Sequence, residues 1–180
     1  MQIVVIGSGI AGITFAEAFN KLRPDCRVTV LTQEGLGYYS RPMLSHGFSR
    51  EDVETKIILR SFESLRETGL EIHSETEVSG LDRATKTVRV RRGGEEFSQA
   101  YDKLVLASGS AALVPGPFRA SALPHWVVNS LSDLIGLRRF RAQLVDSSAS
   151  PRWAIIGGGL IGSEVASDLE IGRASCRERV

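Results

Sequence analysis

The stretch QIVVIGSGIAG at residues 2–12 decides the fold, because a short apolar run stops at a glycine and a helical pattern begins directly after it. Residues 2–6 have the pattern of a parallel strand that is buried on both faces. Residues 10–22 then place apolar and small side chains at roughly helical spacing, and Pro24 ends that helix. Residues 27–32, RVTVLT, return to β-branched side chains. The resulting β-α-β unit predicts an α/β fold with a Rossmann-like, dinucleotide-binding domain.

The first strand is followed by the pattern G-x-G-x-x-G, at Gly7, Gly9 and Gly12. In such a turn the first glycine makes the tight turn, the second lets the backbone approach a pyrophosphate, and the third lets the helix pack on its strand. The unpaired N–H groups and the positive dipole at the helix start then attract phosphate. One copy of this pattern is weak evidence, since a glycine-rich turn also arises for packing alone.

The same pattern recurs 150 residues later, where RWAII at residues 152–156 precedes Gly157, Gly159 and Gly162. The repeat predicts a second strand and helix of the same kind, and it makes packing alone a poor explanation for either turn. Two dinucleotide folds in one chain indicate an enzyme that passes electrons between a flavin and a nicotinamide cofactor.

Composition sets the outer limits of this interpretation. The 180 residues suffice for one ordinary domain, and 42% hydrophobic with 24% charged residues is typical of a soluble globular protein. A net charge of +1 does not indicate binding to nucleic acid or to an acidic membrane surface. Cys26 and Cys176 are too few and too far apart for a zinc site or a C-x-x-C redox pair. With no long apolar run and no basic leader, we predict a cytoplasmic protein without metal, membrane or nucleic acid partners.

Between the two glycine turns, the composition and the hydrophobic periodicity of the sequence change several times. Glycine, tyrosine, serine and proline dominate first, helical spacing follows, and short β runs come next. The expected order is a loop at 35–47, helices at 51–59 and 61–68, an inserted β-meander at about 71–102 with a hairpin turn at Gly93 and Gly94, a buried strand at 104–107, and an amphipathic, basic helix at 130–144.

Three segments carry a family resemblance. YSRPMLSHGFS at residues 39–49 resembles a run in bacterial rubredoxin reductases, which belong to the FAD-dependent pyridine nucleotide-disulfide oxidoreductase superfamily. YDKLVLASG at residues 101–109 resembles the segment that closes the FAD domain there, and GLIGSEVA at residues 159–166 resembles the start of the nicotinamide domain. The resemblance covers residues 1 to about 169. It implies an enzyme that uses FAD and NAD(H) and hands electrons to rubredoxin or a similar small electron-carrier protein.

The resemblance also implies a set of cofactor-binding residues. The FAD pyrophosphate is expected over residues 7–12, with Arg41 and Pro42 on the flavin side. No catalytic acid or base is expected, because hydride passes directly from nicotinamide to flavin. The implied FAD residues are Gly7, Ser8, Gly9, Ala11, Gly12, Thr32, Glu34, Arg41, Pro42, Val78, Ala107, Ser108 and Gly109, and the implied nicotinamide residues are Gly157, Gly159, Leu160, Ile161, Gly162 and Glu164.

The sequence departs from the family pattern at several positions. An acidic residue usually ends the second strand and binds the FAD ribose, but strict counting places Thr32 there, with Glu34 two residues on, so either could reach the ribose. His46 stands where related ferredoxin reductases tend to have a lysine that pairs with the equivalent of Glu164, and we expect an ordinary polar loop residue instead. Ser108 replaces a threonine. No Cys-x4-Cys pair follows the first glycine turn, so electrons are expected to leave the flavin directly for an outside acceptor.

The polar stretch DSSASP at residues 146–151 is the expected domain boundary. We predict an FAD-binding domain at 1–151 and the start of a truncated NAD(P)H-binding domain at 152–169. Only 28 residues follow Arg152, so the chain is expected to be a fragment. Residues 170–180 resemble the translation of a sequencing-library adapter and are expected to be non-native, with a genuine basic helix as the alternative.

Alternative functions stay open at this point. Within the same enzyme class they are an NADH oxidase and the flavin portion of a nitrite reductase, which would share both glycine turns. In a different class, the chain would be a nucleotide-binding module without turnover. Retained yellow flavin in the full-length protein separates the enzyme from that module.

Overall fold

The computed structural model describes residues 1–50, 52–122, 124–146 and 152–177, which form two compact units. One unit contains residues 1–39 and 58–110, and the other contains the described residues of 40–57 and 111–177. The predicted linker at 146–151 lies almost entirely outside the described residues. The predicted domain boundary at residue 151 therefore stays a prediction.

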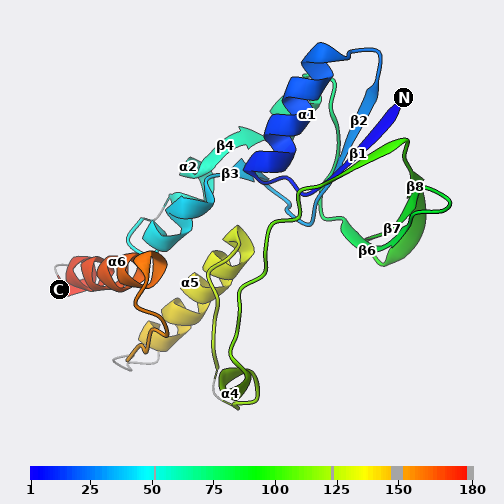
Figure 1. The fold of residues 1–180 in the computed structure, drawn as a ribbon. Helices are drawn as coiled ribbons and strands as arrows, with labels where there is room; N and C mark the ends of the chain where they lie inside the picture. The colour runs from blue at the N-terminus through cyan, green and yellow to red at the C-terminus, as the bar shows by residue number, and fades with distance from the viewer. Residues whose placement is uncertain (51, 123, 147–151, 178–180) are drawn as a thin grey trace. The chain divides into compact units, whose positions relative to one another are not determined.

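A four-stranded parallel sheet forms the centre of the first unit, with the strand order β5-β2-β1-β9. Figure 1 shows its two central strands, β1 and β2, side by side. Its strands are β1 (Gln2–Ile6), β2 (Arg27–Leu31), β5 (Glu71–His73) and β9 (Lys103–Leu106), and α1 (Ile10–Leu22) connects β1 to β2. The predicted β-α-β unit is thereby confirmed, and so is the predicted α/β fold class.

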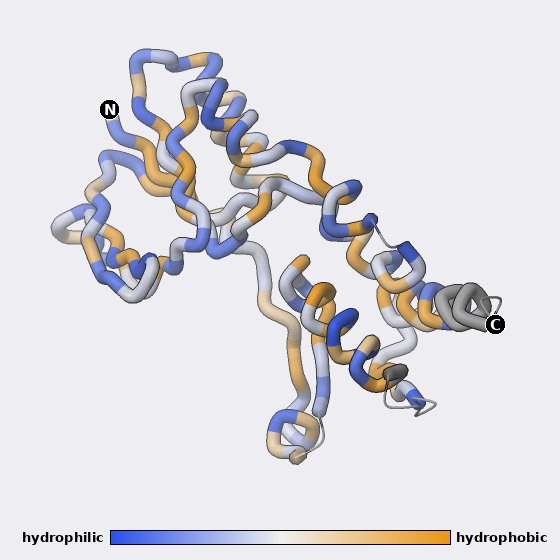
Figure 2. Tube along the Cα trace, turned by 180° about the vertical axis from the view of Figure 1, so that it is seen from behind, coloured by the Kyte–Doolittle hydropathy of each residue, from blue (hydrophilic) through white to orange (hydrophobic). Residues whose placement is uncertain are grey.

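Both faces of the sheet are buried, which explains the apolar run in the first strand. On one face Ile3 and Val5 pack with side chains of α1 and of α3 (Phe62–Arg66). On the other face Val4 packs with Leu31 of β2 and with two valines of β7 (Thr87–Arg92). Figure 2 shows how such hydrophobic stretches and polar stretches succeed one another along the chain. A strand between two layers has no solvent-facing side, so the two-residue alternation of polar and apolar side chains is lost.

An antiparallel meander of β6 (Glu77–Asp82), β7 and β8 (Glu95–Ala100) supplies the second layer. The predicted hairpin turn is confirmed, because Gly93 and Gly94 both have positive φ, at 59° and 87°, as a two-residue turn of this kind requires. The predicted start of the meander at residue 71 is wrong. Residues 71–73 form β5 and pair with β2 in the parallel sheet, and a three-residue run gives no sign of its partner.

Two further predictions of local structure need correction. The predicted helix at 51–59 is limited to α2 (Val53–Lys56), because Ile58–Ser61 forms β4 and pairs with β3 (Gly37–Tyr39). Residue 51 lies outside the described residues. The predicted strand at 104–107 forms as β9 but is only half-buried, with Leu106 68% exposed, because β9 lies at the edge of the described sheet.

The second unit contains a 3-10 helix, η1 (Arg41–His46), with α2, α4 (Gly116–Arg119), α5 (Leu131–Asp146) and α6 (Leu160–Arg177). Helix α5 confirms the helix predicted at 130–144. The strand predicted at 152–156 is wrong: no described strand lies beside these residues, and a strand needs a neighbour for its N–H and C=O groups. The origin of residues 170–180 stays a prediction. None of the helices in the described part of the chain is long and apolar enough to span a bilayer.

Candidate functional site

At two positions of the first glycine turn, the backbone conformation or a close backbone contact permits only glycine. Gly7 has φ +105°, and a Cβ there would lie 2.2 Å from the carbonyl oxygen of Ala107. A Cβ at Gly12 would lie 2.0 Å from the carbonyl oxygen of Gly7. The first and third glycines of the pattern are therefore required by close backbone approach, whatever binds at the turn.

At Gly9, the second glycine, no contact with the described part of the protein requires a glycine. Its φ of −71° is open to any residue, and no neighbouring atom of the described chain lies within 4 Å of the place a Cβ would take. Helix α1 starts at the next residue without a side-chain hydrogen bond at its N-cap and without an acidic residue in its first turn. The open space above Gly9 and these uncapped N–H groups suit the diphosphate of a dinucleotide.

Other predicted residues gather at the same end of the sheet. The N–H of Gly7 donates to Leu31 at 2.9 Å, and the N–H of Ala107 donates to Ile6 at 2.8 Å. The carboxyl ends of β1, β2 and β9 thus meet, and the predicted Ser108 and Gly109 follow directly. Gly109 has φ +69°, which turns the chain away from the sheet. Ligands of open α/β sheets bind at these carboxyl ends.

The two candidates for the FAD ribose, Thr32 and Glu34, have different surroundings in the structure. Thr32 is 4% exposed, its hydroxyl lies 2.8 Å from the hydroxyl of Ser8, and it accepts the N–H of Glu34 at 3.1 Å. The carboxylate of Glu34 is partly exposed and accepts the hydroxyl of Tyr39 at 2.8 Å. Thr32 therefore ties the loop to the glycine turn, whereas Glu34 presents a carboxylate close to the surface.

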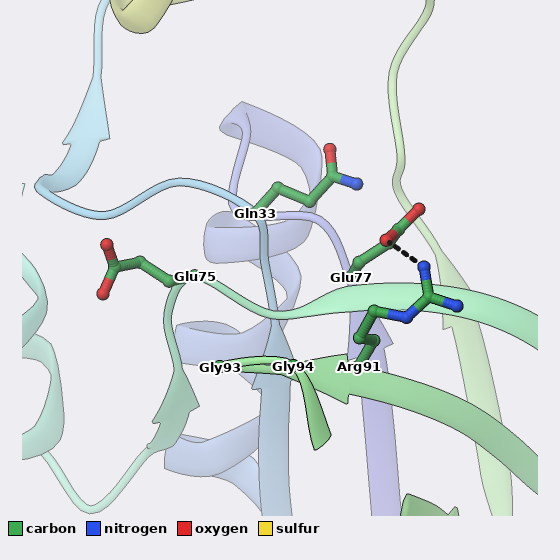
Figure 3. A pocket seen from close by; sticks show the side chains of 6 residues that line it. All are labelled: Gln33, Glu75, Glu77, Arg91, Gly93 and Gly94. Carbon is green, nitrogen blue, oxygen red and sulfur yellow. Dashed lines mark hydrogen bonds and ion pairs between the residues drawn. The ribbon is translucent and has the colours of Figure 1, made fainter. Parts of the chain in front are cut away.

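A pocket of about 340 Å³ lies beyond the end of β2 (Figure 3). One of its lining residues is Glu77, the neighbour of the predicted FAD residue Val78 on β6. The carboxylate of Glu77 lies 3.5 Å from Nη1 of Arg91. Sequence reasoning missed this pocket because its residues come from three separate parts of the chain, and no signal in the sequence joins them. The pocket is lined by Gln33, Glu75, Glu77, Arg91, Gly93 and Gly94.

The second glycine turn repeats the backbone conformation of the first, but among the described residues its first glycine has no neighbour like Ala107. Gly157 has φ +114°, and a Cβ at Gly162 would lie 2.0 Å from the carbonyl oxygen of Gly157. At Gly159 the space is open, with no neighbouring atom of the described residues within 4 Å of a Cβ. The predicted Leu160 and Ile161 begin α6 and are exposed. Glycine is required here by the φ of Gly157 and by the approach of Gly162 to Gly157, both of which lie within the turn, and the turn is formed although residues 152–156 do not pair as a strand.

Within the second unit, α6 binds the segment at residues 41–49. Asp168 is 4% exposed, and its Oδ2 accepts the N–H groups of Phe48 at 2.6 Å and Ser49 at 3.0 Å. Its Oδ1 accepts the hydroxyl of Ser49. Sequence reasoning missed Asp168, although its place four residues after Glu164 puts it on the same face of the helix.

Glu164, one turn earlier on α6, contacts the same segment. The hydroxyl of Ser45 donates to its Oε2 at 2.5 Å, and Nε2 of His46 lies 3.8 Å from that oxygen. The expectation that His46 is an ordinary loop residue away from Glu164 is therefore wrong, because folding η1 onto α6 brings the two side chains together. A protonated His46 would form an ion pair here.

Arg41 and Pro42 are exposed, and the Arg41 guanidinium donates to the carbonyl oxygen of Asn129. A capping box fixes this carbonyl: Oδ2 of Asp133 accepts the N–H groups of Asn129 and Ser130 at 3.1 and 2.8 Å, and the hydroxyl of Ser130 accepts the N–H of Asp133 at 3.1 Å. The Ser-x-x-Asp spacing before α5 was the sequence signal for this cap.

A family model described as pyridine nucleotide-disulphide oxidoreductase matches residues 1–177. The chain belongs to this family. The rubredoxin-NAD(+) reductase of Acinetobacter baylyi is 35% identical over 169 residues, which are 93% of this chain and 42% of that protein. The NADH oxidase of Methanocaldococcus jannaschii is 30% identical over 176 residues, 94% of this chain and 38% of that protein. The reduced CoADR-RHD of Bacillus anthracis has a TM-score of 0.80 at 25% identity, over 95% of this chain and 31% of that chain.

Membership of the family confirms the predicted fold class and the predicted cofactors, FAD and NAD(H). The chain spans about two-fifths of the length of the rubredoxin reductase relative, so the activity of the whole protein is a matter for proposal. The individual site residues stay predictions. The structure brings those of the first unit to one end of its sheet, and it places Arg41, Pro42 and the second glycine turn in the other unit.

Proposed function

We propose that this chain belongs to an FAD-dependent reductase that takes hydride from NADH and passes electrons to a small electron-carrier protein such as rubredoxin. The observation that carries the proposal is the open space above Gly9, repeated above Gly159 among the described residues, at two glycine turns in a member of this family. The 35% identity to a protein named rubredoxin-NAD(+) reductase supports the choice of acceptor.

The residues of this chain bind and orient the cofactors. Bound FAD supplies the hydride acceptor and can release electrons singly to a carrier. The N–H groups at the start of α1 would hold the FAD diphosphate, and Glu34 would accept the ribose hydroxyls. Arg41 would add a fixed positive charge to the flavin side. The second turn, at residues 157–162, would hold the nicotinamide dinucleotide in the same way.

An NADH oxidase that reduces oxygen is the second candidate. The 30% identity to a protein of that name over nearly the whole chain favours it, and both candidates use the same two glycine turns. This chain spans only about two-fifths of either relative, so the choice between the two acceptors is left to experiment.

The test uses the complete protein that contains this chain, purified with its flavin. Anaerobic addition of NADH should bleach the visible absorbance of the flavin, and rubredoxin should then be reduced in repeated turnovers. Because transient redox partners associate through charge, the rate with rubredoxin should fall as salt is raised and screens attraction beyond about 8 Å. The control without rubredoxin records oxygen consumption.

The outcomes separate the candidates. Oxygen consumption as fast as rubredoxin reduction would favour the oxidase. Bleaching by NADH without reduction of either acceptor would mean that the carrier is a different protein. A flavin that NADH does not bleach would overturn the proposed function.

A further inference from the structure

We propose that Asp168 is a positioning residue of the flavin site, which acts by holding the segment at residues 41–49 and thereby fixes Arg41. The inference rests on the proposed function, because it assigns a task to Arg41 in FAD binding. Its starting point is a buried carboxylate that the glycine turn on the same helix does not explain.

The surroundings of Asp168 identify what it holds. A carboxylate that is 4% exposed is costly to bury unless its oxygens are bound, and here they accept hydrogen bonds from two consecutive N–H groups and one hydroxyl. All of these donors belong to Phe48 and Ser49. The carboxylate therefore serves this one point of the backbone.

The backbone at Phe48 is held by a second charged side chain as well. Its carbonyl oxygen accepts a hydrogen bond from Nη1 of Arg141 on α5, at 3.2 Å. The preceding Gly47 lies so close to α5 that a Cβ would be 2.3 Å from Cδ2 of Leu134. Phe48 itself is 6% exposed. Two charged side chains and one close contact thus fix the end of the segment between α5 and α6.

A short rigid turn connects this anchor to Arg41. The N–H of Met43 donates to the carbonyl oxygen of Ser40 at 3.1 Å, and the N–H of Gly47 donates to that of Leu44 at 3.2 Å, so backbone hydrogen bonds close both ends of η1. The other end of η1 is held where Arg41 donates to Asn129. Loss of the anchor at Phe48 and Ser49 would let η1 shift, and Arg41 would shift with it.

Substitutions at Asp168 separate the hydrogen bonds from the charge. The amide of Asp168→Asn can accept both N–H groups with its oxygen and donate to the Ser49 hydroxyl with its nitrogen. Asp168→Leu has a similar size and forms no hydrogen bond, so Phe48 and Ser49 lose their partner. Asp52→Asn is the control, because Asp52 is an exposed carboxylate of the same unit that pairs with Lys56 on the surface.

The experiment measures the FAD dissociation constant and the rate of flavin reduction by NADH in the complete protein, for each variant with Arg41 and with Arg41→Ala. Asp168→Leu should weaken FAD binding roughly tenfold, about the value of one hydrogen bond to a charged group. Asp168→Asn should stay close to wild type, and Asp52→Asn should match it. In the Arg41→Ala background, Asp168→Leu should add little further loss.

Equal losses from Asp168→Leu with and without Arg41 would overturn the inference, because the residue would then act on the general stability of the unit. Wild-type FAD affinity in Asp168→Leu would overturn it too. If that variant does not fold, Ser49→Ala removes one donor to the same carboxylate and should show a smaller, Arg41-dependent loss. Equal loss in both backgrounds would count against the inference. Failure of the wild-type protein to bind FAD would instead refute the proposed function.

Discussion

Gly9→Ala is the substitution that most clearly separates folding from cofactor binding. Gly9 has an ordinary φ of −71°, and an added Cβ meets no neighbouring atom of the described chain within 4 Å. The variant should therefore fold, with a loss of about 0.5–1 kcal/mol because alanine is a poorer N-cap than glycine. The added methyl group would occupy the space that we assign to the diphosphate.

The effect on FAD follows from the contacts that the methyl group would displace. Loss of two hydrogen bonds from backbone N–H groups to a charged phosphate, at about 1.5–3 kcal/mol each, weakens binding by roughly 10²- to 10⁴-fold. Titration of flavin-free protein with FAD measures this, and thermal unfolding of the same samples measures stability. The expected result is a stable variant that retains no flavin after purification.

Gly12→Ala is the matched comparison at the same turn. Its Cβ would lie 2.0 Å from the carbonyl oxygen of Gly7, so this variant should lose about 1–3 kcal/mol of stability or more in the absence of any cofactor. A Gly9→Ala protein that keeps stoichiometric FAD would refute the reasoning, because the space above Gly9 would then not be the diphosphate site.

Three further outcomes are expected. Flavin released by heat from the complete protein should be FAD, since the β-α-β unit offers an adenosine half-site that FMN cannot fill, and recovery of FMN alone would contradict the first turn's assignment. Phe62→Ala should lower the free energy of unfolding in urea by about 3–5 kcal/mol, because Phe62 is 2% exposed in the core beside α1, and a loss below about 1 kcal/mol would mean that the core is misassigned. Burial raises the pKa of the Glu71 carboxyl, but hydrogen bonds from His73 and Thr29 and the charge of Arg27 outweigh burial, so that the net pKa is lowered. The ionised Glu71 therefore stabilises the fold above its unfolded-state pKa, and this stabilisation is lost as the pH falls through the folded-state pKa. Because Glu71 is partly exposed, Glu71→Gln should lower the free energy of unfolding by less than about 1 kcal/mol at pH 7 and leave it unchanged in acid. A loss of stability that does not depend on pH would exclude this ionic contribution.

The secondary structure of the first 31 residues could be predicted from the sequence because each element has its own local sequence signal. The apolar run, the glycine turn and the proline after α1 gave the bounds of β1 and α1 without reference to any other part of the chain. The strand of residues 71–73 was assigned to the wrong sheet because its partner, β2, lies some forty residues away. Residues 58 and 59 were predicted as the end of a helix for the same reason, since pairing of β4 with β3 decides their conformation.

In the candidate site, too, residues with a local role could be predicted from the sequence, and residues whose role depends on distant contacts could not. Glycines at a turn are visible in the sequence because backbone repulsion at Gly7 and Gly12 admits no other residue. Asp168 was not recognised, because its task depends on η1 lying against α6. The segment at residues 41–49 was singled out only by resemblance, and the structure gives a physical reason for its pattern: Ser45, Gly47 and Ser49 each meet a side chain of α5 or α6.

A structure of the complete protein with its flavin bound would test the central claim most directly. The account predicts FAD with its diphosphate oxygens within hydrogen-bond distance of the N–H groups at the start of α1, directly above the Cα of Gly9, and with its ribose beside Glu34. A diphosphate bound elsewhere, or a first glycine turn that packs against protein with no nucleotide near Gly9, would contradict it.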